Sequence, residues 1–169
     1  MIKLNLIPGS KLSFTKGTKV LFTDPCYILS SSLGEEMDKA WSDMCHEMFS
    51  NEGREKNLDI YGIIELNGTK FLYTSTAHGD GCYDVKINGY NHEHKYIINN
   101  GVYVDSGIFC VVDFKLAKQI NPNEYDICGV VVELSKDTEF KIEAVKSNYR
   151  QYGAIVSDNR YIVLDSDEQ

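Results

Sequence analysis

The fold class is decided by the stretch DIYGIIELNGTKFLYTST, residues 59–76 of this 169-residue chain. Two runs rich in β-branched and aromatic residues, 59–66 and 69–76, lie on either side of Asn67-Gly68. This dipeptide favours tight hairpin turns because both of its residues accept positive φ. The stretch therefore predicts an antiparallel hairpin, and similar runs between Asp-Gly and Asn-Gly turns extend the antiparallel pattern over most of 59–164.

We expect strands wherever such runs are bounded by turn residues. The expected strands lie near residues 18–23, 59–66, 69–76, 82–88, 93–98, 102–104, 108–114, 127–134, 138–144, 150–156 and 160–164. A short helix is expected after Phe114. It should end before Asn121-Pro122, because proline cannot continue a helix and restricts the residue before it.

One longer helix is predicted over about residues 33–49. Ser32 lies three residues before Glu35, which is the spacing of a capping box. Apolar residues then recur at the spacing of one helix face, namely Leu33, Met37, Ala40, Trp41, Met44, Cys45, Met48 and Phe49. Such a stripe predicts a helix packed on the sheet. The expected fold is one α+β domain over 1–169, mostly antiparallel β, a sandwich or strongly bent sheet with one main amphipathic helix.

Charge and composition limit the classes of partner and compartment. The chain has 17 basic and 25 acidic residues, a formal net charge of −8, which disfavours duplex nucleic acid as a partner. Residues 1–23 nevertheless hold four lysines and no acid, which allows a local basic surface. No apolar run approaches the roughly 20 residues of a membrane span. Five cysteines without a framework spacing, and no signal-peptide pattern, favour a cytoplasmic location.

Three turns are richer in special residues than a hairpin protein needs. The first is Asp24-Pro25-Cys26-Tyr27, here called the Asp24 turn. Pro25 pushes Asp24 into an extended conformation, so that a carboxylate, a thiol and a phenol follow the strand 18–23 in succession. They are candidate ligand contacts. The alternative is a structural turn in which Asp24 caps backbone amides and Tyr27 packs inward.

The second, the Gly79 turn, comprises residues 78–83. Gly79 and Gly81 flank Asp80 and allow a close backbone approach to a ligand, as in the glycine-rich nests that bind anions. His78 adds a titratable ring and Tyr83 an aromatic surface. The alternative is a plain hairpin, because Asp-Gly is also a strong hairpin signal.

The third, the Asp105 turn, comprises Asp105-Ser106-Gly107. It interrupts a predicted strand, and we expect a bulge that redirects a carboxylate and a hydroxyl, or one that merely bends the sheet. Each of the three turns has a neighbouring tyrosine that could stack on a planar base, namely Tyr27, Tyr83 and Tyr103.

Enzyme chemistry has weaker support in the sequence, and we expect neither a metal nor a cofactor. His92 and His94 point to one face of a strand, but no zinc-ligand spacing accompanies them. A thiol nucleophile in one of the turns would need His78 as its base. Metal-free hydrolysis would use His78 with Asp80 or Asp105.

In these turns the chain resembles a group of small proteins encoded in bacteriophage genomes. The resemblance rests on the Asp24 turn after the first strand, the helix with Trp41, the Gly-Asp-Gly-x-Tyr sequence of the Gly79 turn and the Asp105 turn, all within residues 18–114. It implies an accessory viral protein that counters host defence in the host cytoplasm. Such proteins act by sequestering a cyclic-nucleotide signal, by cleaving it, or by occluding a host protein.

We therefore predict a protein that sequesters a small nucleotide-like ligand at a rim formed by the three turns. The predicted ligand-binding residues are Asp24, Cys26, Tyr27, His78, Gly79, Asp80, Gly81, Tyr83, Asp105 and Ser106. The carboxylates would bind ribose or base donors, and the glycine amides and Ser106 would face phosphate. Tyr27 and Tyr83 would stack, and His78 or Lys19 would supply positive charge.

Two other functions stay open at this point. The main alternative is a phosphodiesterase or related hydrolase at the same rim, with His78, Asp80 and Asp105 as candidate acid–base groups and no catalytic residue assigned. The third is a protein-binding inhibitor or structural component. Sequestration also favours a homo-oligomer with the ligand at a subunit interface.

Overall fold

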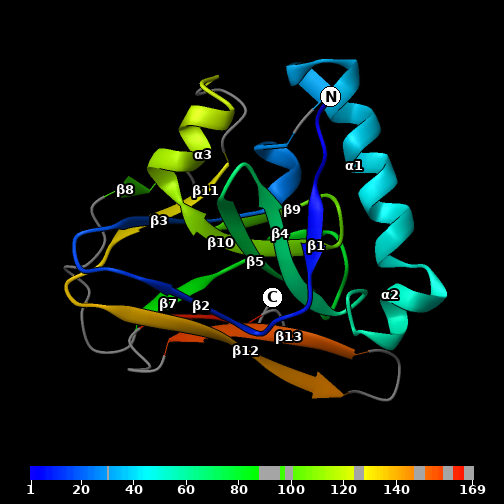
Figure 1. Ribbon diagram of the computed structural model, residues 1–169. Helices are drawn as coiled ribbons and strands as arrows, with labels where there is room; N and C mark the ends of the chain where they lie inside the picture. The colour runs from blue at the N-terminus through cyan, green and yellow to red at the C-terminus, as the bar shows by residue number, and fades with distance from the viewer. Residues whose placement is uncertain are drawn as a thin grey trace.

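Two larger antiparallel sheets, a two-stranded ribbon and a layer of helices make up the fold in the computed structural model (Figure 1). The structure describes residues 1–29, 31–87, 96–97, 101–123, 128–146, 151–157 and 162–165. Every strand pairing in these residues is antiparallel. The predicted α+β class with mostly antiparallel strands is confirmed.

The larger sheet, as described, has seven strands and contains the hairpin that the sequence predicts. In spatial order the strands are β1 (Asn5–Ile7), β4 (Tyr61–Leu66), β5 (Thr69–Ser75), β10 (Ile108–Asp113), β3 (Lys19–Thr23), β11 (Gly129–Glu133) and β8 (Tyr96–Ile97). Asn67 and Gly68, at φ 51° and 86°, turn the chain between β4 and β5. Leu66 pairs with Thr69 beside this turn.

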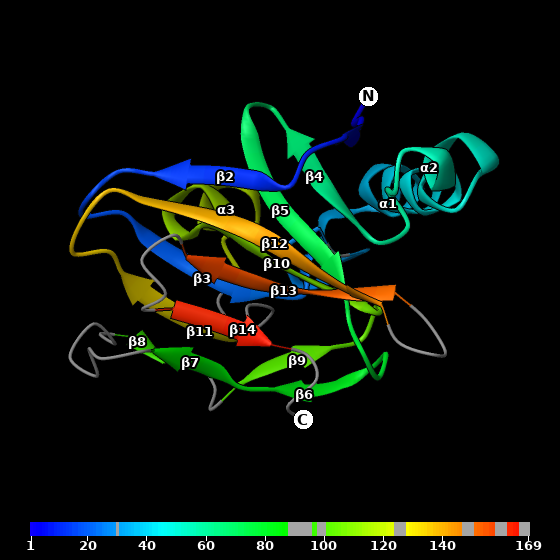
Figure 2. The ribbon, with the colours of Figure 1, turned by 90° about the horizontal axis from the view of Figure 1, so that it is seen from below.

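The second sheet, as described, has five strands, and Figure 2 shows it in front of the first. Its strands in order are β2 (Lys11–Phe14), β12 (Thr138–Lys146), β13 (Gln151–Ser157), β14 (Ile162–Asp165) and β7 (Val85–Ile87). A separate ribbon is formed by β6 (Gly81–Tyr83) and β9 (Val102–Val104).

The longest described helix agrees with the predicted one. The helices are α1 (Glu35–Met48), α2 (Asn51–Glu55) and α3 (Phe114–Ile120), with 3₁₀ helices at Pro25–Tyr27 and Ser31–Leu33. The predicted capping box is wrong, because Gly34, at φ 109°, is the N-cap of α1 and no side chain caps it. α2 has no counterpart among the predicted helices, whereas α3 does. None of the described helices combines the length and the apolar character needed to cross a membrane.

Successive residues of the central strands enter two different cores. In β3, Leu21 belongs to the helix-side core, whereas Val20 and Phe22 belong to the inter-sheet core between the two sheets. This alternation follows from the two-residue period of a strand. The helix-side core receives the stripe of α1, namely Met37, Ala40, Met44 and Met48. Phe49, at the end of the predicted stripe, is instead 54% exposed.

Some predictions fail where the chain passes between sheets. β1 and β2 were not predicted. The predicted strand 82–88 is divided at Asp84, because β6 pairs with β9 whereas β7 pairs with β14. The predicted bulge at the Asp105 turn is wrong, because residues 105–107 connect β9 to β10, which lie in different sheets. The predicted strand 93–98 lies largely outside the described residues, which include only 96–97 of it.

Candidate functional site

The carboxylate of Asp24 joins two of the three predicted turns. It is fully buried, and its Oδ2 accepts hydrogen bonds from the backbone N–H groups of Asp105 at 2.8 Å and Ser106 at 2.7 Å. Its Oδ1 accepts from the Ser106 hydroxyl at 2.7 Å and from the Cys26 N–H at 2.8 Å. The Asp24 turn and the Asp105 turn are therefore in direct contact. Asp24 caps backbone amides as the structural alternative predicts, but Tyr27 is only half-buried rather than packed inward.

Strand pairing explains why these two turns meet. β3 and β10 are antiparallel neighbours, with Thr23 opposite Cys110. The end of β3 therefore lies beside the beginning of β10, although the two turns are about 80 residues apart in sequence. Asp24 is also the N-cap of the 3₁₀ helix Pro25–Tyr27, whose first position suits the fixed φ of proline.

Burial dominates the electrostatics of Asp24. It raises the pKa of this carboxyl group, and the hydrogen bonds from Ser106, Cys26 and Asp105 oppose that shift. A carboxylate offers about four acceptor sites, and four donors of the protein already use them. Asp24 therefore has little capacity for the ribose or base donors that the sequence assigns to it.

The phenol of Tyr27 is also engaged within the protein, because it donates a hydrogen bond to the carboxylate of Asp105. Burial, followed by this hydrogen bond and the charge of Asp105, raises the pKa of Tyr27. The hydroxyl consequently stays protonated and acts as a donor. Both predicted ligand groups, the phenol and the carboxylate, thus have a partner in each other.

The Gly79 turn reaches the same end of the larger sheet through β6. β6 pairs with β9, and Gly81 lies opposite Val104, the residue before the Asp105 turn. The carbonyl oxygen of Gly79 accepts hydrogen bonds from the hydroxyls of Tyr83 at 2.7 Å and Thr76 at 2.6 Å. Tyr83 is fully buried, so its ring has no exposed face for the predicted stacking.

Carboxylates give this end of the molecule a negative character. Burial, then Asp24, and then Asp105 and Asp80, raise the pKa of the Cys26 thiol. A thiol with a raised pKa is protonated near neutral pH and is a poor nucleophile. Cys26 is therefore unsuited to nucleophilic catalysis, and the phosphate of a ligand would be repelled here. His78 and Asp80 are exposed on the Gly79 turn.

The metal alternative draws no support from the described part of the chain. There, no group of three or more His, Cys, Asp or Glu side chains is placed to hold a metal ion. His92 and His94, on which the sequence-based alternative rests, lie outside the described residues. That alternative stays a prediction.

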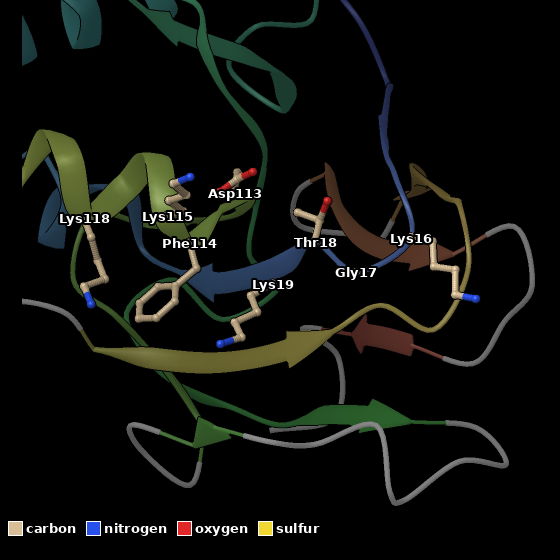
Figure 3. A pocket seen from close by; sticks show the side chains of 8 residues that line it. All are labelled: Lys16, Gly17, Thr18, Lys19, Asp113, Phe114, Lys115 and Lys118. Carbon is tan, nitrogen blue, oxygen red and sulfur yellow. The ribbon is translucent and has the colours of Figure 1, made fainter.

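The opposite end of the β3–β10 pair carries a cavity of about 910 Å³, which we call the lysine groove (Figure 3). Its lining comes from the turn before β3, from the start of β3 and from the start of α3. The lining residues are Lys16, Gly17, Thr18, Lys19, Asp113, Phe114, Lys115 and Lys118. Four of these residues are lysines, and only one of them is acidic.

The pairing of β3 with β10 also assembles the lysine groove. Asp113, the last residue of β10, lies opposite Val20, so that the start of α3 is beside Lys19. The side chain of Asp113 caps α3 by accepting a hydrogen bond from the Leu116 N–H at 3.1 Å. Its charge is thus directed at the helix backbone. On the other side of β3, Glu133 of β11 lies opposite Lys19 and is the acidic residue of β11 that pairs with β3.

Positive charge is concentrated in the lysine groove. Lys16, Lys115 and Lys118 form no ion pair with any residue that the structure describes. Two other lysines of the chain, Lys39 and Lys56, form ion pairs with Asp43 and Glu52 on exposed helical surface. The groove is therefore a local basic surface on a chain whose net charge is −8.

The resemblance to phage proteins rests on the three turns and the helix with Trp41, and two of those turns are in direct contact through Asp24. In comparisons with known proteins, no family model, no curated protein and no solved structure matches this chain. The phage relationship stays a prediction.

Proposed function

We propose that the protein binds a small phosphate-bearing, nucleotide-like ligand in the lysine groove and holds it without cleaving it. The observation that carries this proposal is the convergence of four lysines on one cavity of about 910 Å³ in an acidic chain. Small-molecule sites commonly occupy about 300–1,000 Å³. A phosphate group carries the charge opposite to that of the lysine ammonium groups and accepts charge-assisted hydrogen bonds from them.

Binding fits the lining of the groove better than hydrolysis does. Among the described lining residues, Asp113 is the single carboxylate and none is a histidine, and the Asp113 carboxylate caps α3. The groups on which the hydrolase alternative depends, His78 and Asp80, belong to the Gly79 turn at the other end of the β3–β10 pair. Sequestration of an intact signal is also one of the three modes of action that the phage resemblance implies, and we include it in the proposal.

The proposal is tested by incubating the purified protein with linear and cyclic mono- and dinucleotides and recording native mass spectra. The bound molecules are then released by denaturation and analysed. We expect an adduct that is released intact. A hydrolysed product would favour the phosphodiesterase alternative, and the absence of every adduct would contradict the proposal.

Neutralising two groove lysines should weaken binding. The double variant Lys115→Gln/Lys118→Gln should lose at least about tenfold in affinity, because each charge-assisted hydrogen bond to a phosphate contributes on the order of 1.5 kcal/mol or more. Titration calorimetry at low and high salt measures this loss, and added salt should reduce the difference between wild type and variant.

A matched control is the double variant Lys39→Gln/Lys56→Gln. It makes the same change in net charge on exposed helical surface outside the lysine groove. We expect it to bind like wild type. Equal affinity losses in the two double variants would show a general effect of charge and would contradict a site in the groove.

A further inference from the structure

Phe114 gives the lysine groove an aromatic wall. It is the first residue of α3, and its half-buried side chain packs against the helix-side core while it also lines the groove. The hydrogen bond from the Leu116 N–H to Asp113 holds the backbone at this point. Figure 3 shows the ring of Phe114 between the side chains of Lys118 and Lys19. The groove thus places a planar apolar surface between two ammonium groups.

Lys118 follows Phe114 by one helical turn, so both side chains leave the same face of α3. The Nζ of Lys118 lies 5.3 Å from the centroid of the Phe114 ring. A cation–π contact of this kind is weak where the cation is exposed, and Lys118 is exposed. A planar ring from a ligand can therefore share or replace the contact. An anionic group attached to that ring would then lie near the ammonium of Lys118.

We infer that Phe114 stacks on a planar ring of the ligand while the groove lysines bind its phosphate, so that the ligand is a nucleotide rather than a sugar phosphate or inorganic phosphate. This inference rests on the proposed function. It assigns the preference of the groove for a nucleotide over other phosphates to one residue, Phe114. It replaces the stacking roles predicted for Tyr27 and Tyr83. The first donates its hydroxyl to Asp105, and the second is fully buried.

The wild-type protein provides the first test. Affinities for AMP, ribose 5-phosphate and pyrophosphate are measured by calorimetry at one ionic strength. AMP differs from ribose 5-phosphate by its base, so we expect it to bind about tenfold more tightly through stacking. Equal affinities for these two, or binding of pyrophosphate alone, would overturn the inference and leave the proposed anion site in place. Binding of none of the three would also overturn the inference, whereas the proposed function is contradicted only if no nucleotide of the wider panel forms an adduct.

The second test changes the ring and keeps the packing. Phe114→Leu retains an apolar side chain at the helix-side core and removes the aromatic face. It should bind AMP about tenfold more weakly than wild type and bind pyrophosphate equally well. Phe114→Tyr, which keeps the ring, should bind AMP as wild type does. An unchanged AMP affinity in Phe114→Leu, or an equal loss in Phe114→Tyr, would overturn the inference.

Discussion

Asp24 carries a buried carboxylate whose four hydrogen bonds all come from its own turn and the Asp105 turn. Removing a charge from water is costly unless the charge is fully hydrogen-bonded. The donors of Cys26, Asp105 and Ser106 supply these hydrogen bonds. The same hydrogen bonds hold the backbone of both turns in place. We therefore interpret Asp24 as a structural residue that joins β3 to β10 at one end.

This interpretation predicts that Asp24→Asn destabilises the fold. An amide nitrogen in place of Oδ2 would leave the N–H groups of Asp105 and Ser106 without an acceptor, and in place of Oδ1 it would leave the Cys26 N–H without one. We expect the free energy of unfolding at pH 7 to fall by about 2–4 kcal/mol, as measured by urea denaturation. Ser106→Ala, which removes only the hydroxyl donor, should cost about 1 kcal/mol. If Asp24→Asn were as stable as wild type, Asp24 would not be the residue that holds the turns together.

The raised pKa of Asp24 adds a pH dependence to the same comparison. The folded state binds this proton more tightly than the unfolded state does. The contribution of the group to the free energy of unfolding is therefore greatest below its ordinary pKa of 3.8, and it decreases as the pH rises through the higher pKa of the folded state. The free energy of unfolding of wild type should therefore exceed that of Asp24→Asn by less and less as the pH rises from below 3.8 to above the folded-state pKa. An advantage that grows with pH would show that the hydrogen bonds outweigh burial.

At the scale of elements, the β3–β10 pair positions the two sites discussed above, the acidic turns and the lysine groove. One end holds Asp24 and the Asp105 turn, and the other end holds Lys19 beside the start of α3. Five residues of β3 separate the two ends, a distance of about 15 Å in a strand. The acidic turns and the lysine groove are thus distinct sites on one rigid support.

Close packing around this pair gives a prediction for β11. A Cβ added at Gly129 would collide with the carbonyl oxygen of Phe22 in β3, and a backbone atom cannot move aside as a side chain can. Gly129→Ala should therefore lower the free energy of unfolding by about 1–3 kcal/mol. Ser13→Ala, at an exposed position of β2, is the control and should change it little. Thermal and urea denaturation of the two variants measure the difference, and equal stability would contradict this packing.

Local sequence patterns predict the elements that are stabilised locally. The β4–β5 hairpin follows from Asn67-Gly68, α1 from its apolar stripe, and α3 from the limit set by Asn121-Pro122. β1 and β2 are short strands, and only their partners β4 and β12 in different sheets define them. No local periodicity marks such strands, so tertiary pairing decides them.

At the scale of the whole molecule, charge is divided between two ends. The net charge of −8 conceals a groove with four lysines, while the carboxylates of Asp24, Asp80 and Asp105 act together on Cys26 at the far end of the β3–β10 pair. A small anion is therefore attracted to one end and repelled from the other. This division is the reason for placing the ligand away from the three turns.

The sequence could reveal only half of this site. The acid-free stretch 1–23 points to a local basic surface, and Lys19 was a predicted source of positive charge. Lys115 and Lys118 lie about 100 residues further along the chain, and only the pairing of β3 with β10 brings them to the same cavity. The turns were conspicuous in the sequence because special residues also serve structure, as the hydrogen bonds of Asp24 show.

The central claim is that a nucleotide binds in the lysine groove, and ¹⁵N-resolved NMR of the full chain titrated with AMP tests it most directly. We expect the largest changes in amide chemical shift at Gly17, Lys19, Lys115 and Lys118, with the amides of Gly79 and the Asp105 turn unchanged. Saturable changes confined to the Asp105 and Gly79 turns would contradict the claim and return the ligand to the rim that the sequence predicts.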